Sequence, residues 1–250
     1  MNCRLLKTGH NSATHNMGVD EAVLKSVSDG SAPTTLRLYG WRPAAVSIGY
    51  FQSLKDEVDF VACKKYGVDV VRRITGGGAV YHDVELTYSF ITPEDTVPKD
   101  ILESYKLICS GLIEGFRELG IDAVFAPLND IVAGGKKISG NAQTRRMNCV
   151  LQHGTIILGV DPKKMFTILK VPNEKIRDKM IAAVEERVTS VEKILGRCII
   201  YDEAVDAFAK GFATALKLNY AEGELTDDEL ADAEKLSRTK YATKEWNNKR

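Results

Sequence analysis

Two glycine-rich stretches contain the residues of this chain that are best suited to chemistry. The first, RRITGGGAVYHD at residues 72–83, places two arginines, a threonine and a histidine around three consecutive glycines. Glycine loses more backbone entropy on folding than any other residue, so three in a row indicate a strained turn or a ligand lying against bare backbone. Because the flanking side chains can donate hydrogen bonds to anions, this stretch predicts a loop that binds a phosphate or a carboxylate.

The familiar nucleotide-binding loops do not fit this stretch. A Walker loop ends in G-K-[ST], and a Rossmann fingerprint opens a helix, whereas these glycines join two predicted strands at residues 68–73 and 85–92. A run of three glycines taken alone is equally compatible with a simple turn. The donors on both sides favour a binding loop of a different nucleotide fold.

The second stretch, GGKKISGNAQ at residues 134–143, contains a lysine pair between glycines in a predicted strand. Strict alternation along a strand places Lys137 and Ser139 on the same face. A lysine is a compact positive charge that can stabilise a phosphate whose bonds are changing. A lone lysine pair is most often a solvated turn, but together with the glycine loop it leads us to expect a functional lysine here.

The elements that must position these stretches are read from hydrophobic periodicity and from turn residues. Apolar side chains at helical spacing predict a long helix over 99–119 that ends at Gly120. Further predicted helices cover 16–27 and 56–66, and the chain is mainly helical from residue 161 onward. Predicted strands cover 34–41 and 44–51 as a hairpin-like pair, and then 121–126, 130–143 and 149–161.

The predicted strands come mostly in adjacent pairs and do not alternate regularly with helices. This pattern favours an α+β fold with a mixed, mainly antiparallel β-sheet flanked by helices over a doubly wound one. Gly49, inside the second predicted strand, marks a point where another group approaches the backbone.

Composition excludes several classes of partner. The chain has 250 residues with 34 basic and 34 acidic side chains, so no net charge attracts nucleic acid or an anionic membrane. It contains no run of about 18 apolar residues and no secretory signal at its start. Its five cysteines lack paired C-x-x-C spacing, which is typical of reduced thiols. We therefore expect a cytoplasmic protein with neither a nucleic-acid nor a membrane partner.

The two stretches together resemble a known superfamily. RRITGGGAVYHD, followed by LNDIVAGGKKISGNAQ and then LQHGTIIL, is similar to the lipoate-protein ligases and octanoyltransferases, and most of all to a short lipoate-protein ligase of the A type. The similarity runs from NMGVDEA, at residue 16, to the end of the chain. It implies the catalytic fold of biotin-protein ligases, related to class II aminoacyl-tRNA synthetases, over residues 1–250. Residues from about 200 to 250 would form a helical tail, without a separate accessory domain.

The ligase branch of this superfamily implies a two-step reaction. Lipoate or octanoate reacts with ATP, accompanied by Mg²⁺, to give acyl-AMP, and the acyl group then passes to a lysine of a lipoyl carrier domain. The implied carriers are lipoyl domains of 2-oxoacid dehydrogenase complexes or the carrier protein of glycine cleavage. Lys137 would be the catalytic lysine. The residues implied to bind ATP or the acyl-adenylate are Arg72, Arg73, Thr75, Gly76, Gly77, Gly78, Ala79, Val80, Tyr81, His82, Asn129, Asp130, Lys137, Gly140 and Asn141.

The acyl chain of such a substrate needs an apolar slot. Val46, Ile48 and Val80, on neighbouring predicted strands, are candidates for its lining. The same residues are equally suited to an ordinary hydrophobic core, and the sequence does not separate the two interpretations.

Some members of the superfamily use no ATP and carry the acyl group on a cysteine thioester. In those members the cysteine lies in an insertion just before the G-[RK]-K-[IV] motif, and the corresponding stretch here, APLNDIVAGGKK, contains none. Cys149 is the nearest alternative, but an extended strand would separate it from His153 by about 13 Å, beyond hydrogen-bond distance. A buried structural thiol is the better interpretation of Cys149.

Other features favour the transferase branch. SGNAQTRR and LQHG resemble the octanoyltransferases more than some ligases. A cysteine-dependent transferase and a non-catalytic partner subunit that binds acyl groups or nucleotides therefore stay open as alternatives, as does the need for an accessory ligase subunit.

Overall fold

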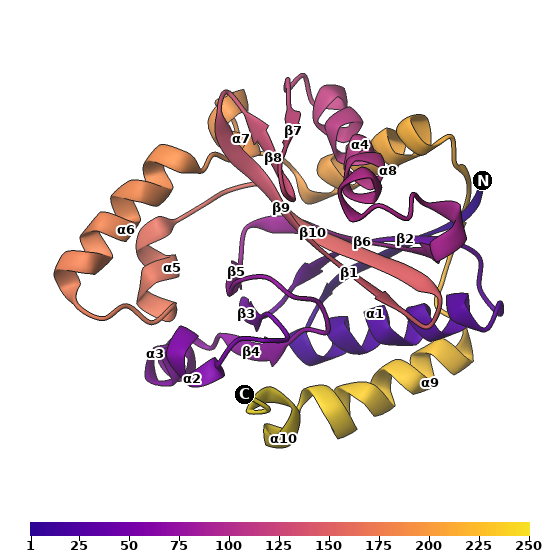
Figure 1. The fold of residues 1–250 in the computed structure, drawn as a ribbon. Coiled ribbons are helices and arrows are strands. Elements are labelled where there is room, and N and C mark those ends of the chain that lie inside the picture. The colour runs from indigo at the N-terminus through magenta and orange to yellow at the C-terminus, as the bar shows by residue number, and fades with distance from the viewer.

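The fold is described from a computed structural model that covers residues 1–250. Its largest element is an eight-stranded sheet in the order β11-β1-β2-β6-β10-β9-β8-β7 (Figure 1). All neighbouring strands are antiparallel except β1, which runs parallel to both β2 and β11. The strands are β1 (Asn2–Asn11), β2 (Thr35–Trp41), β6 (Glu85–Pro93), β7 (Val124–Ala126), β8 (Asp130–Ala133), β9 (Lys136–Arg146), β10 (Cys149–Ile157) and β11 (Asn219–Gly223). The predicted α+β class with a mainly antiparallel mixed sheet is confirmed.

A second sheet of three strands carries the glycine loop. β3 (Ala45–Ile48) lies in its centre, parallel to β4 (Asp69–Arg72) and antiparallel to β5 (Val80–His82). The glycines connect β4 to β5, so they join strands as predicted. The predicted hairpin of 34–41 with 44–51 is wrong. One edge of β2 pairs with β1 and the other with β6, whereas β3 belongs to the smaller sheet.

Helices cover both faces of the large sheet (Figure 1). On one face α4 packs against α8, and on the other α1 packs against α9. None of the helices is long and apolar enough to cross a membrane. The helices are α1 (Ala13–Ser28), α2 (Leu54–Glu57), α3 (Phe60–Tyr66), η1 (Glu94–Thr96), α4 (Ile101–Glu118), α5 (Pro162–Ile168), α6 (Glu174–Arg187), α7 (Val191–Leu195), α8 (Tyr201–Leu216), α9 (Asp227–Leu236), η2 (Ser237–Tyr241) and α10 (Lys244–Asn247).

The predicted helix over 99–119 is confirmed as α4. The Asp100 side chain accepts a hydrogen bond from the Glu103 N–H at its start, and Gly120 adopts the left-handed conformation just beyond its end. Its apolar stripe, which includes Ile108, Leu112 and Phe116, is fully buried in the core between the sheet and α8. This helix forms where predicted because its local signals and its tertiary packing agree.

The C-terminal part of the chain wraps around the molecule. Residues 200–250 are mainly helical, as expected, but they also contain β11, which pairs with β1 at the edge of the large sheet. Neither β1 nor β11 was predicted from the sequence. β11, with the residues NYAEG, is mostly exposed and lacks an alternating pattern, so only its pairing with β1 identifies it as a strand.

The glycine loop packs against the end of β3. The N–H of Tyr50 donates to the Thr75 carbonyl at 2.8 Å, and the N–H of Arg73 donates to the Ile48 carbonyl at 3.0 Å. A Cβ atom on Gly49 would lie only 1.9 Å from the carbonyl oxygen of Gly77. The close approach expected at Gly49 is confirmed, and the approaching group is the glycine loop itself.

Replacement of Gly49 by alanine is expected to lower the free energy of unfolding by about 1–3 kcal/mol, the usual cost of overpacking. Two backbone segments would have to separate to admit the methyl group. Urea unfolding of Gly49→Ala measures this cost. Gly76→Ala is the matched control, since a Cβ there meets no atom within 4 Å. Equal stability of the two variants would show that the contact at Gly49 does not hold the loop.

Candidate functional site

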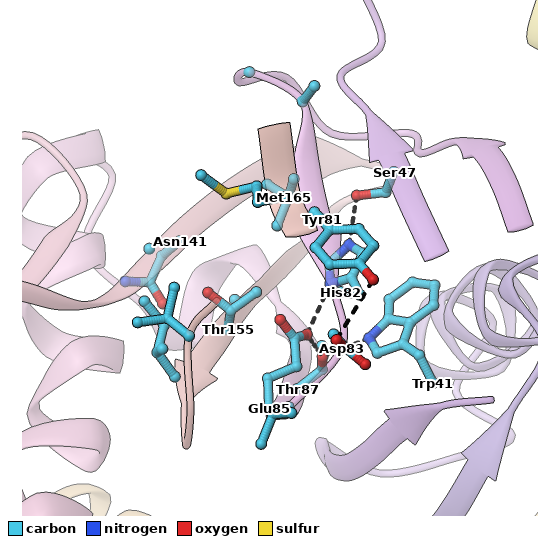
Figure 2. A pocket seen from close by; sticks show the side chains of 18 of the residues that line it. Trp41, Ser47, Tyr81, His82, Asp83, Glu85, Thr87, Asn141, Thr155 and Met165 are labelled. Carbon is cyan, nitrogen blue, oxygen red and sulfur yellow. Dashed lines mark hydrogen bonds and ion pairs between the residues drawn. The ribbon is translucent and has the colours of Figure 1, made fainter. Parts of the chain in front are cut away.

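A cavity of about 540 Å³ lies where the two glycine-rich stretches face each other (Figure 2). One wall comes from the glycine loop and β5, and the opposite wall comes from β9 and β10. The rest of the lining comes from several segments, which include α1, β2, β3, β6, residues 159–161, one residue of α5, and residues 184, 188 and 192. Stretches that are about 60 residues apart in the sequence therefore form a single site.

The structure places most of the predicted site residues on this cavity. Those that line it are Arg73, Gly77, Gly78, Ala79, Val80, Tyr81, His82, Asn129, Lys137, Gly140 and Asn141. Thr75, Gly76 and Asp130 are not part of the lining but contact residues that are. Their roles toward a ligand stay predictions.

Lys137 reaches the cavity across the backbone of β9. Its Nζ lies 2.7 Å from Asp130 Oδ1, and a Cβ on Gly140 would come within 2.7 Å of that same nitrogen. Both charged side chains are partly exposed, so the pair is open to an arriving ligand. The absence of a side chain at Gly140 is what lets the lysine lie in this position.

A β-bulge determines the direction of Lys137. Ser139 pairs with Ile131, whereas Lys137 pairs with the next residue of β8, Val132, so Ile138 is the extra residue. Residues opposite each other in a sheet share a face, and successive residues of β8 face opposite ways. Lys137 and Ser139 therefore lie on opposite faces, and the strict alternation predicted from the sequence is wrong at this point.

Two asparagines beside Lys137 are held rigidly by each other. Asn141 Nδ2 donates to the Asn129 carbonyl at 2.8 Å, and Asn129 Nδ2 donates to the Asn141 carbonyl. The Tyr88 hydroxyl donates to Asn141 Oδ1 at 2.7 Å. Gly154 makes room for this amide, because a Cβ there would lie 2.3 Å from Asn141 Oδ1. The orientation of both amides is thus set before a ligand binds.

The glycine loop presents unpaired backbone donors. The N–H groups of residues 76–79 donate to no acceptor in the protein, and Gly77 has a φ of 93°, which favours glycine. Beneath the loop, the Arg73 Nη2 donates to the carbonyls of Gly76 and Gly78 at 2.7 and 2.8 Å. Unpaired N–H groups in a concave loop are a typical binding site for anions.

Arg73 shapes this loop from below. Its other donors go to Thr75 Oγ1 and to the carbonyl and hydroxyl oxygens of Ser47, so every part of the guanidinium is bonded within the protein. Burial lowers the pKa of Arg73 to about 10. In this conformation the loop N–H groups, and not the guanidinium, are free to meet a ligand.

Arg72 has a different role from the one predicted. Its side chain is fully buried and does not line the cavity. The guanidinium donates to five backbone carbonyls, those of Gly49, Tyr50, Gln52, Trp246 and Asn247. In return, Trp246 Nε1 donates to the Arg72 carbonyl at 2.9 Å. Arg72 anchors the C-terminal helix α10 to the base of the glycine loop, and no local signal distinguishes it from Arg73.

Several cavity residues were not singled out from the sequence. Trp41 stacks on His82 with ring centroids 4.0 Å apart (Figure 2). Ser47 and Glu85 flank the same imidazole, and His153 comes from β10. Of these, the sequence drew attention only to His153, which lies in LQHGTIIL and was weighed as a partner of Cys149 but not as a residue of the cavity.

The apolar lining also differs from the prediction. Val46 and Ile48 are buried in a small core with Leu54 and do not reach the cavity, whereas Val80 does. The cavity's apolar surface comes mostly from other segments. It includes Met17, Trp41, Val84, Ile157, Val160, Met165, Val184 and Val188.

None of the five cysteines lines the cavity. Four of them are buried and only Cys198 is exposed. Burial raises the pKa of Cys3 and Cys109 to about 12 and that of Cys63 to about 11, and it also raises the pKa of Cys149. Cys149 packs in the core between the sheet and α1. A nucleophilic thiolate is therefore absent from the site.

Comparison with known proteins agrees with this geometry. Residues 12–213 match the family model of the lipoyl protein ligase A/B catalytic domain. The chain belongs to this family. Octanoyltransferase LipM from Anoxybacillus flavithermus is 40% identical over 272 residues, which cover 99% of this chain and 98% of that protein.

Solved structures of the family share the whole fold. A bi-partite lipoate protein ligase from Thermoplasma acidophilum has a TM-score of 0.87 and 33% identity, covering 99% of this chain and 95% of that one. A lipoate-protein ligase A bound with ATP has a TM-score of 0.86 and 33% identity, covering 99% of both chains. The lipoyl protein ligase A/B family thus includes both ligases and transferases that are similar to this chain over nearly its full length.

Arg72→Lys is expected to lower the free energy of unfolding by about 2 kcal/mol or more, because an ammonium cannot satisfy five carbonyl acceptors. Urea unfolding followed by tryptophan fluorescence measures it, since Trp246 lies against Arg72. Arg238→Lys is the control, because Arg238 is exposed and has only a 3.9 Å ion pair. Similar midpoints for both variants would contradict an anchoring role.

Proposed function

We propose that this member of the lipoyl protein ligase A/B family is an ATP-dependent lipoate-protein ligase. It would convert lipoate or octanoate into acyl-AMP and then pass the acyl group to a lysine of a lipoyl carrier domain. One observation carries the proposal: the cavity joins a lysine and a loop of unpaired N–H groups but contains no cysteine. The site is equipped for anions and not for a thioester.

In the first step two anions have to be brought together. The carboxylate oxygen of the acyl substrate attacks the α-phosphorus of ATP, and pyrophosphate leaves. A positive charge between two anions reduces their repulsion, and Lys137 lines the cavity on the wall opposite the glycine loop. The loop N–H groups would bind phosphate oxygens. Asp130 would hold the ammonium in place until the substrates arrive.

In the second step the carrier lysine attacks the acyl carbonyl carbon, and AMP leaves. Mg²⁺ would arrive with the phosphates of ATP, because no group of three or more His, Cys, Asp or Glu side chains is placed to hold a metal ion. The similar ligase A structure with ATP bound supports nucleotide use. The carriers we propose are lipoyl domains of 2-oxoacid dehydrogenase complexes or the glycine-cleavage carrier protein.

The bi-partite ligase of Thermoplasma acidophilum also bears on the partners. Its structure was determined together with work on its E2 lipoyl domain, and the present chain is similar to it over 99% of its length. By analogy, a ligase that needs a separate accessory subunit for its first step is the alternative form of this proposal.

A cysteine-dependent octanoyltransferase is the second candidate, and the names of the similar LipM proteins favour it. That reaction requires a thiolate beside the acyl group. The aligned length of 272 residues exceeds the 250 residues of this chain, so LipM has at least 22 positions without a counterpart here. The stretch before Lys137 in this chain contains no cysteine, and this observation supports the ligase.

The expected product of purified protein with Mg-ATP and lipoate or octanoate is acyl-AMP, detected by mass spectrometry. Lys137→Ala should form none, because Arg73, the only other lysine or arginine that lines the cavity, has its guanidinium bonded within the protein. A variant with all five cysteines replaced by serine should keep the reaction if it stays folded.

Two other outcomes separate the alternatives. Adenylate that forms only after a fraction containing an accessory subunit is added would support the two-subunit form of the ligase. Octanoyl transfer from an octanoyl carrier to a lipoyl domain without ATP, lost in the cysteine-free variant, would establish the transferase instead.

Gly140→Ala is expected to leave stability nearly unchanged but to lower the rate of adenylation by about 10²-fold, the scale of a 1 Å misplacement. The added methyl group displaces only the flexible end of Lys137. Single-turnover kinetics and urea unfolding measure the two effects. Ser139→Ala is the control, because this hydroxyl has no partner and lies on the opposite face of β9. Equal rates for both variants would contradict the assigned position of Lys137.

A further inference from the structure

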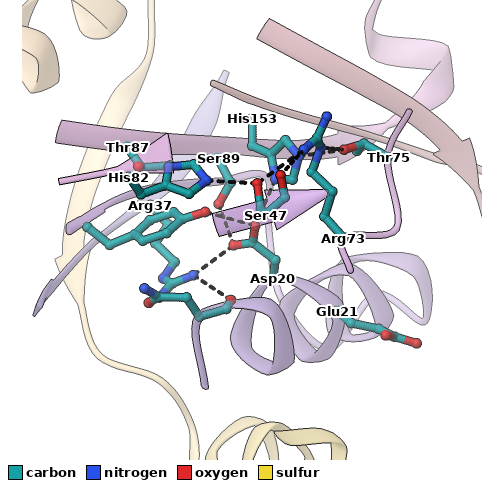
Figure 3. Close-up of polar contacts among 12 residues, drawn as sticks. Asp20, Glu21, Arg37, Ser47, Arg73, Thr75, His82, Thr87, Ser89 and His153 are labelled. Atoms are coloured by element: carbon teal, nitrogen blue, oxygen red, sulfur yellow. Dashed lines mark hydrogen bonds and ion pairs between the residues drawn. The ribbon is translucent and has the colours of Figure 1, made fainter. Parts of the chain in front are cut away.

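Arg73 is a buried cation without a direct ion pair. Its side chain lies beneath the glycine loop, and no carboxylate is within 4 Å of the guanidinium. Buried charges are usually compensated by an opposite charge. Two chains of hydrogen bonds lead from Arg73 to buried carboxylates and supply this compensation. Figure 3 shows the chain that ends at Asp20, and Figure 2 shows Ser47, His82 and Glu85 of the other.

The first chain runs through the small sheet to Glu85. Arg73 Nη1 donates to Ser47 Oγ at 3.1 Å, and that oxygen lies 2.7 Å from His82 Nε2. On the other side of the ring, His82 Nδ1 lies 2.7 Å from Glu85 Oε1. The Thr87 hydroxyl donates to the same carboxylate oxygen at 2.6 Å.

The second chain repeats the same order of groups on the other side of Arg73. Arg73 Nε donates to Thr75 Oγ1 at 3.2 Å, and that oxygen lies 2.7 Å from His153 Nε2. His153 Nδ1 lies 3.1 Å from Asp20 Oδ2. Asp20 also accepts hydrogen bonds from Arg37 at 2.7 Å and from Ser89 at 2.9 Å.

The position of each proton follows from the two ends of the chains. Arginine only donates and a carboxylate only accepts, so each imidazole carries a proton on Nδ1, and in a neutral ring Nε2 accepts from the hydroxyl. Burial lowers the pKa of His153, which keeps its ring neutral. Although burial opposes it, the hydrogen bonds from His153 and Ser89 and the charge of Arg37 lower the pKa of Asp20.

We propose that Ser47–His82–Glu85 and Thr75–His153–Asp20 are two positioning relays that hold Arg73 and, through it, the glycine loop. With Nε and Nη1 of the guanidinium held by the two hydroxyls, its Nη2 stays on the carbonyls of Gly76 and Gly78. The N–H groups of the loop then stay free of protein acceptors. Only the consequence for ATP affinity rests on the proposed function.

The same order of groups activates a serine nucleophile in hydrolases, but here the hydroxyl has another partner. Ser47 Oγ accepts a hydrogen bond from Arg73, and Ser47 is 2% exposed. Thr75 is fully buried in the same way. These contacts suit a hydroxyl that orients the guanidinium and does not react.

The tautomers can be read from ¹⁵N spectra of protein labelled at the histidine rings. The chain has only four histidines, so His82→Asn and His153→Asn assign the signals. Both rings are expected to carry a proton on Nδ1, and the His153 ring is expected to be neutral at pH 7. A neutral ring with its proton on Nε2 would overturn the relay that contains that histidine, and a cationic His153 would overturn the second relay.

Paired variants test whether the relays position the loop. Thr75→Val removes the hydroxyl at nearly constant shape, and Thr75→Ser restores it. We expect Thr75→Val to speed amide exchange at Tyr50, whose N–H is bonded to the Thr75 carbonyl, by about tenfold. We expect it to weaken ATP binding by a similar factor, with Thr75→Ser close to wild type. Equal exchange in all three proteins would overturn the positioning role.

Ser47→Ala tests the relay of Ser47, His82 and Glu85. The double variant Ser47→Ala with Thr75→Val tests whether both relays act on the Arg73 guanidinium. Because both hydroxyls hold one guanidinium, the two effects on exchange should not add. Additive effects would overturn convergence on Arg73. If the wild-type protein fails to bind ATP, the ligase proposal fails, while the tautomer and exchange measurements still decide the relays.

Discussion

A three-glycine loop held against bare backbone is the constraint on which the site depends. Gly49 has no side chain, so the Gly77 carbonyl can pack against it. From the other side, the Arg73 guanidinium binds the carbonyls of Gly76 and Gly78. With its carbonyls held by the protein, the loop leaves its N–H groups unpaired, and three of its residues, Gly77, Gly78 and Ala79, line the cavity. Preorganised donors of this kind need no rearrangement when a phosphate arrives.

The rest of the fold supports this loop from several directions. The small sheet carries β4 and β5, between which the loop is suspended, and Arg72 anchors the base of the loop to the last helix of the chain. The relays add contacts from α1 and β10 through Asp20 and His153. Elements from both ends of the chain therefore determine the geometry of a loop of a few residues.

The opposite wall depends on a local irregularity. The bulge in β9 directs Lys137 across Gly140 into the cavity, where a regular strand would have turned it to the other face. The bulge and the mutual bonds of Asn129 and Asn141 place one charged and two amide side chains beside the loop. No cysteine lies in this wall or elsewhere in the lining of the cavity.

The local sequence pattern by itself determined the α+β class and the helix α4. It also determined that the three glycines connect two strands, because hydrophobic periodicity and turn residues act over short distances. Recognition of the paired motifs also indicated that Lys137 and the glycine loop belong to one family's site. Only the tertiary structure decided that Arg72 is an anchor while Arg73 lies beneath the loop, since adjacent arginines differ only in distant contacts. The pairing of β2 with β6, the bulge beside Lys137 and the convergence of Asp20 and His153 on one guanidinium likewise follow from long-range packing, which short-range sequence patterns do not encode.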